Sequence, residues 1–296
     1  MPATIIDGRL IASQIREELQ QQVDELKARG LVPGLAVLLV GDNPASQAYV
    51  SMKEKACGKM GFHLMTERLS EETTQADLLA LIQAFNRDPE IHGILVQLPL
   101  PDHLNEEQVL LAISPEKDVD GFHPMNVGRL VAGVPHLLPA TPAGIQQLLL
   151  RSGYPPEGKH VVIVGRSNIV GKPMANILLQ KKAGANATVT ICHTGTPDIG
   201  AFTRQADIAI IAAGRAEFVT GGMIKPGAVV IDVGSNRIED PAAKKGYRFV
   251  GDVHFDSVSE VAGAITPVPG GVGPMTITML LANTVKAAAF CVQKNE

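Results

Sequence analysis

The sequence has few of the features that mark secreted, membrane-bound or nucleic-acid-binding proteins. It contains no tryptophan and only 3 cysteines among 296 residues, an odd number that excludes a fully paired disulfide framework. Its 26 basic residues do not outnumber its 30 acidic residues, so the sequence offers no basic surface for nucleic acid or an anionic membrane. The N-terminus has no basic segment followed by an apolar run, and apolar stretches such as residues 93–100 are too short to span a bilayer. We therefore expect a cytoplasmic protein with free thiols and with no nucleic-acid or membrane partner.

Metal-binding and serine-hydrolase patterns are missing as well. No C-x-x-C or H-x-x-x-H pair occurs, and the residues around Asp118 lack the spacing of a calcium loop. The G-x-S-x-G turn of serine hydrolases fails at its last position in residues 165–169. We expect no metal site.

Strand-sized apolar runs alternate with amphipathic helices along the chain. In the first half, strands are expected at residues 34–41, 63–68 and 93–100, and helices at 13–29, 46–60 and 74–87. In the second half, strands are expected at residues 160–165, 188–192, 208–214 and 228–234, before a final helix at 275–292. Between residues 120 and 141 the pattern loosens into Gly, Pro, His and Asn, which favours a domain junction. The alternation predicts an α/β fold with parallel strands joined by helical crossovers.

A candidate nucleotide-binding turn lies at residues 165–171 (GRSNIVG), between a strong strand and a helix. In this context a dinucleotide pyrophosphate rests on helix-terminal N–H groups. Five residues separate Gly165 from Gly171, and Pro173 follows Lys172, so the turn is not a P-loop. It also departs from G-x-G-x-x-G, and the loop alone leaves open a tight turn that binds no ligand.

The expected cofactor is NADP. The second strand of this half ends ICHTGT (residues 191–196), without the carboxylate that binds the ribose 2′-hydroxyl of NAD. That absence permits a 2′-phosphate, and Arg166 is a candidate counter-charge. His193 is either a further contact or an ordinary surface residue.

The helix at residues 46–60 carries a candidate acid–base lysine. Tyr49, Lys53 and Met60 fall on one stripe, whereas Lys55 and Lys59 face away. A lysine among apolar neighbours loses its proton more readily, which suits chemistry near neutral pH. The alternative is a Lys53 side chain that extends out of the stripe to water.

Two further polar positions interrupt apolar or extended segments. Gln97 lies in the apolar run 93–100, close to the strand's carboxyl end, and its amide needs either a local partner or a ligand. Asp118 and Asp120 lie in residues 115–121 at the expected junction. On local grounds these aspartates are either site residues or turn caps.

Five segments carry a family resemblance: residues 49–55 (YVSMKEK), 93–100 (GILVQLPL), 115–121 (PEKDVDG), 165–173 (GRSNIVGKP) and 267–276 (PVPGGVGPMT). In this order, over nearly the whole chain, they resemble the bifunctional methylenetetrahydrofolate dehydrogenase/cyclohydrolase family. The resemblance implies that the chain oxidises 5,10-methylenetetrahydrofolate to the methenyl form with NADP and hydrolyses the product to 10-formyltetrahydrofolate. It also implies a homodimer that acts in one-carbon metabolism and purine biosynthesis.

The resemblance further implies two α/β domains with a central cleft. The folate substrate domain would comprise residues 1–120 and the C-terminal helix 275–296, and the NADP-binding Rossmann-like domain residues 121–274. Lys53 and Gln97 would be catalytic. The folate would contact Tyr49, Val96, Leu98, Asp120, Pro269, Gly270, Gly271, Val272 and Gly273, and the cofactor Gly165, Arg166, Ser167 and Ser235. Gly195 departs from the larger or basic residue that many relatives carry near the 2′-phosphate.

Two other functions remain as alternatives. One is an NADP-dependent dehydrogenase of the shikimate or amino-acid type without hydrolase activity, which does not account for Gln97 or the PGGVGP loop. The other is a non-catalytic NADP-binding module, which would bind the cofactor and no folate.

Overall fold

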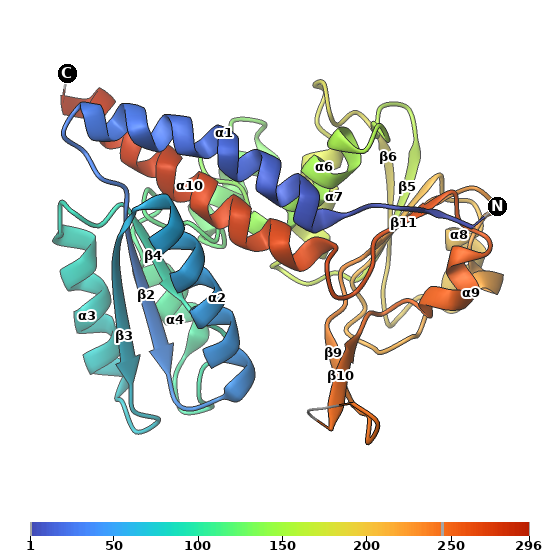
Figure 1. Cartoon of the computed structure of the whole chain (residues 1–296), viewed down its shortest axis with the longest axis horizontal. Helices are drawn as coiled ribbons and strands as arrows, with labels where there is room; N and C mark the ends of the chain where they lie inside the picture. Colours follow the sequence, from blue (N-terminus) through green and yellow to red (C-terminus); the bar gives the residue numbers. More distant parts are fainter. Residues whose placement is uncertain (1, 244–245, 296) are drawn as a thin grey trace. The chain divides into compact units, whose positions relative to one another are not determined.

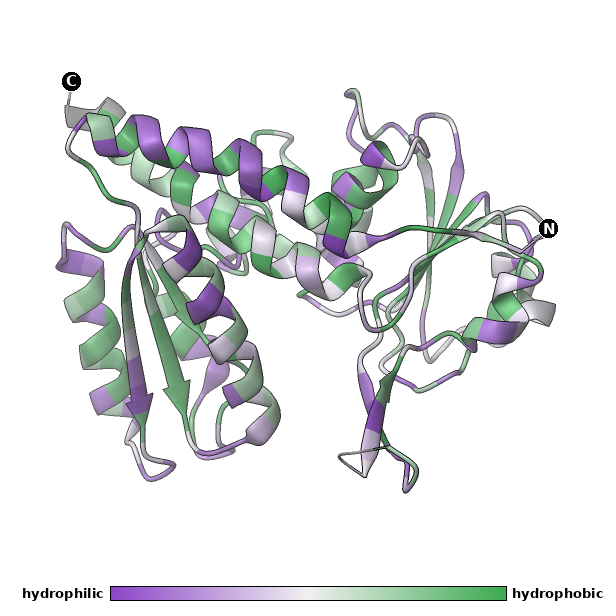
Figure 2. Cartoon of the chain, viewed as in Figure 1, coloured by the Kyte–Doolittle hydropathy of each residue, from purple (hydrophilic) through white to green (hydrophobic). Residues whose placement is uncertain are grey.

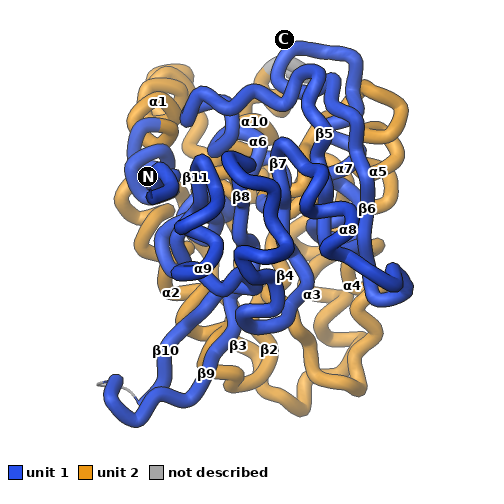
Figure 3. The backbone as a smooth tube through the Cα atoms, turned by 90° about the vertical axis from the view of Figure 1, so that its right-hand side faces the viewer, with its two compact units in different colours: residues 1–14, 141–276 blue, residues 15–140, 277–296 orange. Residues whose placement is uncertain are grey.

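The computed structural model describes residues 2–243 and 246–295, and the chain divides into two compact α/β units (Figure 3). Unit 1 comprises residues 1–14 and 141–276, and unit 2 comprises residues 15–140 and 277–296. This division differs from the predicted domains at three places. Residues 1–14 belong to unit 1, where β1 (Thr4–Ile5) pairs with β11 (Ala264–Ile265). Residues 275–276 also belong to unit 1, and residues 121–140 belong to unit 2.

Unit 2 is built on a parallel sheet of order β3-β2-β4, formed by β2 (Gly34–Val40), β3 (His63–Leu69) and β4 (Gly93–Val96). β2 is hydrophobic and buried along its whole length, as predicted for a strand covered on both faces (Figure 2). α2 (Pro44–Met60) contacts β2 and β3. α3 (Gln75–Arg87) and α4 (Glu106–Ala112) share a core with β2 and β4. Because the two crossovers move in opposite directions across the sheet, α2 and α3 cover opposite faces (Figure 1).

The predicted helices are present, with shifted ends. α1 (Gly8–Ala28) buries the predicted stripe of Ile15, Leu19, Val23 and Leu26. It begins five residues earlier than expected because Asp7 Oδ1 accepts the N–H groups of Arg9 and Leu10. A helix that the sequence analysis missed, α5 (Pro124–Val131), occupies the loose segment, where the His123 side chain caps it and Pro124 begins it.

Unit 1 holds a parallel sheet of order β1-β11-β8-β7-β5-β6. The four predicted strands are confirmed and three end earlier than expected: β5 (His160–Val164), β6 (Thr188–Cys192), β7 (Ile208–Ile211) and β8 (Val229–Asp232). An antiparallel hairpin of β9 (Asn236–Glu239) and β10 (Tyr247–Val250) was not predicted, because its strands are short and the exposed Arg237, Glu239 and Arg248 interrupt their apolar residues. The remaining helices are α6 (Ala140–Arg151), α7 (Gly171–Leu178), the short 3-10 turn η1 (Gly221–Met223), α8 (Ile199–Thr203) and α9 (Phe255–Ser259).

The last helix, α10 (Val272–Asn295), is longer than predicted. Within it, residues Val272–Val292 are long and apolar enough to cross a membrane, which the sequence analysis overlooked. However, 56% of that stretch is buried inside the protein, as is typical of a core helix of a globular protein.

Candidate functional site

Local caps set the start and end of α2, the helix that carries Lys53. Asn43 caps the helix by accepting the N–H groups of Ala45 and Ser46, and Pro44 occupies its first turn. Gly61 ends it in the left-handed conformation at φ 66°. Between these caps, the buried residues of α2 recur at helical spacing and form one face.

Lys53 lies on this buried face and is only 8% exposed. Cys57 and Met60 follow it on the same face, while Lys55 and Lys59 are exposed. The prediction that Lys53 joins the apolar stripe is confirmed, and the alternative of an ammonium extended into water is wrong. Tyr49, one turn earlier, is half-buried.

The Lys53 ammonium meets a single amide oxygen. Its Nζ donates to Gln97 Oε1 at 3.0 Å, and Gln97 Nε2 donates to the carbonyl of Leu98 at 2.7 Å. β4 ends at Val96, four residues before the predicted end, so Gln97 lies just past the carboxyl end of the strand. The local bond of its Nε2 orients the amide so that its oxygen faces the lysine. Sequence reasoning had singled out both residues, and the structure brings them together.

Three titratable groups cluster at this point. Burial lowers the pKa of Lys53, and the negative charge of Asp120 partly offsets that shift. Burial raises the pKa of the Asp120 carboxyl to about 6, although Lys53 acts in the opposite direction. Burial also raises the pKa of Cys57 to about 12. The base and the acid therefore change charge closer to neutral pH than they would in water, as acid–base chemistry requires.

The neighbouring carboxylates Asp118 and Asp120 have separate roles. Asp118 is buried and accepts the N–H groups of Phe122 and His123 and the side-chain amide of Asn126, so it anchors the start of α5. Of these two carboxylates, it is Asp120 whose charge affects the pKa of Lys53. Turn capping therefore applies to Asp118, whereas Asp120 lies close enough to Lys53 for their charges to interact.

Two other residues assigned to the substrate flank Gln97. Val96 is 3% exposed and packs in the core with α3 and α4, so only its backbone is available to a ligand. Leu98 is half-buried and precedes a cis peptide bond to Pro99. The sequence analysis counted Cys57 only as a free thiol and did not connect it with Lys53, although its place four residues later on one helix face was a signal.

In unit 1, the glycines of the 165–171 turn bring strand, turn and helix together. A Cβ on Gly165, which has φ +127°, would lie 2.1 Å from the carbonyl oxygen of Ala212 after β7. A Cβ on Gly171 would lie 2.2 Å from the oxygen of Gly165. Both positions therefore require glycine. The chain reverses its direction of strand addition between β5 and β7, so this contact marks the topological switch point where α/β sheets bind ligands.

The side chains beyond this turn are accessible. Arg166, Ser167 and Ser235 are exposed at the carboxyl ends of β5 and β8. Ser167 Oγ accepts the N–H groups of Val170 and Gly171 at 3.1 and 3.4 Å. At the end of β6, the Nδ1 atom of His193 accepts the N–H of Gly195 at 3.1 Å. The exposed guanidinium and hydroxyl groups at this edge suit a phosphorylated cofactor.

The loop at residues 267–273 also belongs to unit 1. A Cβ on Gly271 would lie 2.7 Å from Thr266 Cβ, and a Cβ on Gly8 would lie 1.8 Å from the Gly271 oxygen. Gly270 has φ +117° and faces the Arg9 side chain. The Val268–Pro269 peptide in this loop is cis, and Val272 and Gly273 begin α10. Close backbone packing explains the glycines at 270 and 271.

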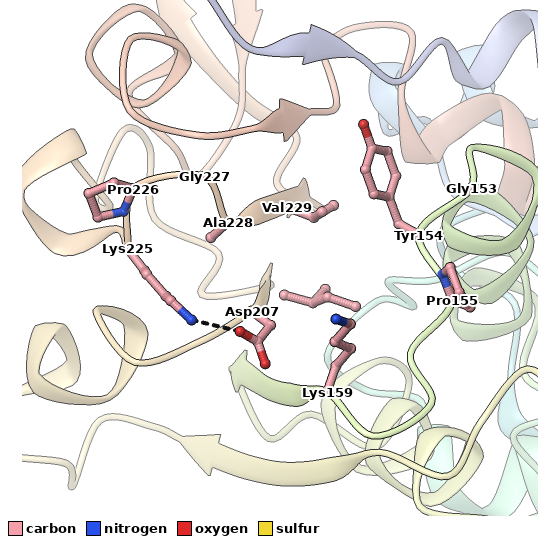
Figure 4. Close-up of a pocket in the computed structure, with 11 residues that line it drawn as sticks. Gly153, Tyr154, Pro155, Lys159, Asp207, Lys225, Pro226, Gly227, Ala228 and Val229 are labelled. Atoms are coloured by element: carbon pink, nitrogen blue, oxygen red, sulfur yellow. Dashed lines mark hydrogen bonds and ion pairs between the residues drawn. The ribbon is translucent and has the colours of Figure 1, made fainter.

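A pocket in unit 1 lies away from all of these residues. It has a volume of about 540 Å³ and lies at the amino-terminal ends of β5, β7 and β8, where Lys225 Nζ pairs with Asp207 at 2.7 Å (Figure 4). It contains none of the predicted site residues and lies at the wrong end of the strands for a dinucleotide. Among the residues that the structure describes, no group of three or more His, Cys, Asp or Glu side chains could hold a metal.

Known proteins match the chain over both halves. Family models match residues 6–120 (tetrahydrofolate dehydrogenase/cyclohydrolase, catalytic domain) and 139–292 (the NAD(P)-binding domain of the same family). The bifunctional protein FolD of Syntrophus aciditrophicus is 58% identical over 288 residues, 97% of this chain and 98% of the relative. The bifunctional FolD structure from Campylobacter jejuni is 50% identical with a TM-score of 0.92, covering 98% of this chain and 99% of that one. FolD from Trypanosoma brucei, solved with NADP and an inhibitor, is 42% identical with a TM-score of 0.94 and covers 99% of each chain.

Proposed function

Since the chain belongs to the tetrahydrofolate dehydrogenase/cyclohydrolase family, we propose that Lys53, Gln97 and Asp120 form the centre of its folate chemistry. The protein is a bifunctional enzyme that oxidises 5,10-methylenetetrahydrofolate with NADP and hydrolyses the methenyl product to 10-formyltetrahydrofolate. The shikimate-type alternative is not favoured, because relatives of this identity are named bifunctional.

Lys53 moves the protons in the hydrolysis. Water attacks the positively charged methenyl carbon, and the neutral amine takes a proton from that water. The resulting ammonium gives the proton to the folate nitrogen whose bond to the carbon breaks, and the second proton of the water is released as the formyl group forms. The observation that carries this role is the buried Nζ at 3.0 Å from Gln97 Oε1, with its pKa lowered by burial. Gln97 keeps the amine in place between proton transfers.

Binding and orientation fall to the other assigned residues. Tyr49 stacks on the folate from the turn before Lys53, Asp120 binds the pterin, and Leu98 with the backbone of Val96 lines the substrate site. Pro269, Gly270, Gly271, Val272 and Gly273 supply a close backbone wall. NADP, when bound, supplies the hydride acceptor, and Gly165, Arg166, Ser167 and Ser235 hold it. Support for the cofactor positions comes from the switch-point geometry at Gly165.

Mixing the purified protein with 5,10-methylenetetrahydrofolate and NADP tests this function. We expect NADPH to appear, the concentration of the methenyl compound to rise and then fall, and 10-formyltetrahydrofolate to accumulate. A shikimate-type dehydrogenase would reduce no NADP with this folate, and a binding module would bind NADP in calorimetry but bind no folate. Either result would overturn the proposal.

We also propose a cytoplasmic homodimer that serves purine biosynthesis. The family resemblance favours the dimer, and the free cysteines Cys57, Cys192 and Cys291 suit a reducing compartment. Light scattering should give about twice the 31.3 kDa chain mass.

A further inference from the structure

Two buried carboxylates in unit 1 have no part in the chemistry described so far. Asp232, the last residue of β8, is 3% exposed, and Asp252, just after β10, is 0% exposed. Asp232 Oδ1 accepts the N–H groups of Gly234 and Asp252, both at 2.9 Å, and its Oδ2 accepts that of Val253 at 3.1 Å. Backbone N–H groups from the loop after β8 and from the segment after β10 therefore bind the Asp232 carboxylate.

Asp252 binds the next two segments in the same way. Its Oδ2 accepts the N–H of Gly214 at 2.8 Å. Its Oδ1 accepts the N–H of Arg215 at 3.0 Å and the side-chain amide of Asn236 at 2.8 Å. Together the two carboxylates tie the loop after β7, the loop after β8 and the segment after β10 into one unit.

The surrounding backbone is shaped to fit this pair. A Cβ on Gly251 would lie 1.7 Å from Asp232 Oδ2, and a Cβ on Gly234 would lie 2.4 Å from Asp252 Oδ1. Burial, with a smaller contribution from the Asp252 charge, raises the pKa of Asp232 to about 7. Two buried carboxylates that repel each other are costly for stability, and such perturbed groups concentrate at functional sites.

The loops held by this pair lie where the cofactor is expected. Ala212 contacts the Gly165 turn at the switch point, and Asp252 holds Gly214 and Arg215 directly after it. Ser235, assigned to the cofactor, stands between Gly234 and Asn236, which the two carboxylates bind. Because β8, β7 and β5 are parallel neighbours, the loops that follow them lie side by side at the carboxyl ends of the strands.

We propose that Asp232 and Asp252 are positioning residues for the dehydrogenase reaction, which fix the loops after β7 and β8 as the rim of the NADP site. This inference rests on the proposed function only in placing NADP at the carboxyl ends of the sheet. The carboxylates act through the backbone and do not touch the reacting atoms. The hydrolysis needs no cofactor and should be insensitive to them.

Asp252→Asn is the main test, because it keeps the shape and replaces one accepting oxygen with a donor that faces the N–H groups. Asp207→Asn is the matched control: Asp207 accepts the His160 N–H and pairs with Lys225 at the opposite end of the same sheet. For each variant, the KM and kcat for NADP, the cofactor-free hydrolysis of methenyltetrahydrofolate and the Tm are measured on one preparation.

We expect Asp252→Asn to raise the KM for NADP about tenfold, the loss typical of a charge-assisted hydrogen bond, and to leave hydrolysis within about twofold of wild type. Asp207→Asn should lower the Tm without changing that KM. If Asp252→Asn does not fold, Asn236→Ala, which removes one donor, should raise the KM about threefold.

An unchanged KM for NADP in a folded variant would overturn the inference, as would a parallel loss of hydrolysis. A wild-type protein that reduces no NADP would instead contradict the proposed function. In that case, direct titration with NADP would still compare Asp252→Asn with wild type.

Discussion

Replacing Lys53 with methionine separates the two activities most sharply. Methionine has nearly the same length and is apolar, so Lys53→Met removes the amine without opening a cavity on the buried face of α2. Positioned proton transfer contributes about 10²- to 10⁴-fold to a rate, and we expect the hydrolysis of methenyltetrahydrofolate to fall at least about 100-fold. Loss of the Lys53 charge should also raise the pKa of Asp120 above about 6, because Lys53 lowers it.

The protein should not be destabilised by this change. Lys53 is 8% exposed, and its burial disfavours the ammonium, so an apolar side chain there should leave the free energy of unfolding equal or raise it by about 1 kcal/mol. Lys55→Met, on the exposed face of the same helix, is the control and should keep both activities. Hydrolysis is followed by the loss of methenyl absorbance, and stability by urea unfolding. A folded Lys53→Met protein that hydrolyses at the wild-type rate would remove the lysine from the mechanism.

Three further outcomes are expected. As the pH falls through about 6, Asp120 gains a proton and the KM for the folate should rise. In initial-rate assays, Asp120→Asn should have a high KM at every pH. A pH-dependent KM in that variant would contradict the assignment of Asp120. Gly165→Ala should abolish NADP binding and lower the free energy of unfolding in urea by about 3 kcal/mol, because the added Cβ would overlap the Ala212 oxygen. Gly158→Ala, at φ +68° with no atom within 4 Å of the added Cβ, should lower it by only about 1 kcal/mol. Equal losses of stability in the two variants would refute the role of the Ala212 contact. Cys57 and Cys192 are buried, and their pKa values are raised, so iodoacetamide at neutral pH should label the half-buried Cys291 first. If mass spectrometry finds Cys57 labelled in the folded protein, the burial of Cys57 is contradicted.

Hydrophobic periodicity predicted the elements that bury a continuous face. β2, β7 and β8 were found because strands covered on both faces read as unbroken apolar runs. The β9–β10 hairpin was missed because its alternate residues are exposed and polar, and α5 because its two turns lie among turn-forming residues. The His123–Pro124 pair, a cap followed by proline, was an available signal for α5.

The site followed the same rule. Lys53 and Gln97 were visible because each is a lone polar residue in an apolar pattern, which needs an explanation from local sequence alone. Asp232, at the end of an apolar strand, carried the same signal and was overlooked. Asp252 could not be found in this way, since its partners Gly214, Arg215 and Asn236 lie 16 to 38 residues away and meet it only in the fold.

The segment at residues 117–120 shows how neighbouring residues divide structural and chemical roles. Lys117 donates to the carbonyls of Phe85 and Asp88 and so caps the end of α3. Asp118 anchors the start of α5, and the carbonyl of Val119 accepts the side-chain amide of Asn283 from α10 at 2.8 Å. Three successive residues thus bind three different helices, which fixes the backbone at Asp120 without using its carboxylate. The Asp120 side chain can therefore keep its raised pKa beside Lys53. The local sequence left both Asp118 and Asp120 as site residues or turn caps, because the distinction between them depends on helices distant in sequence.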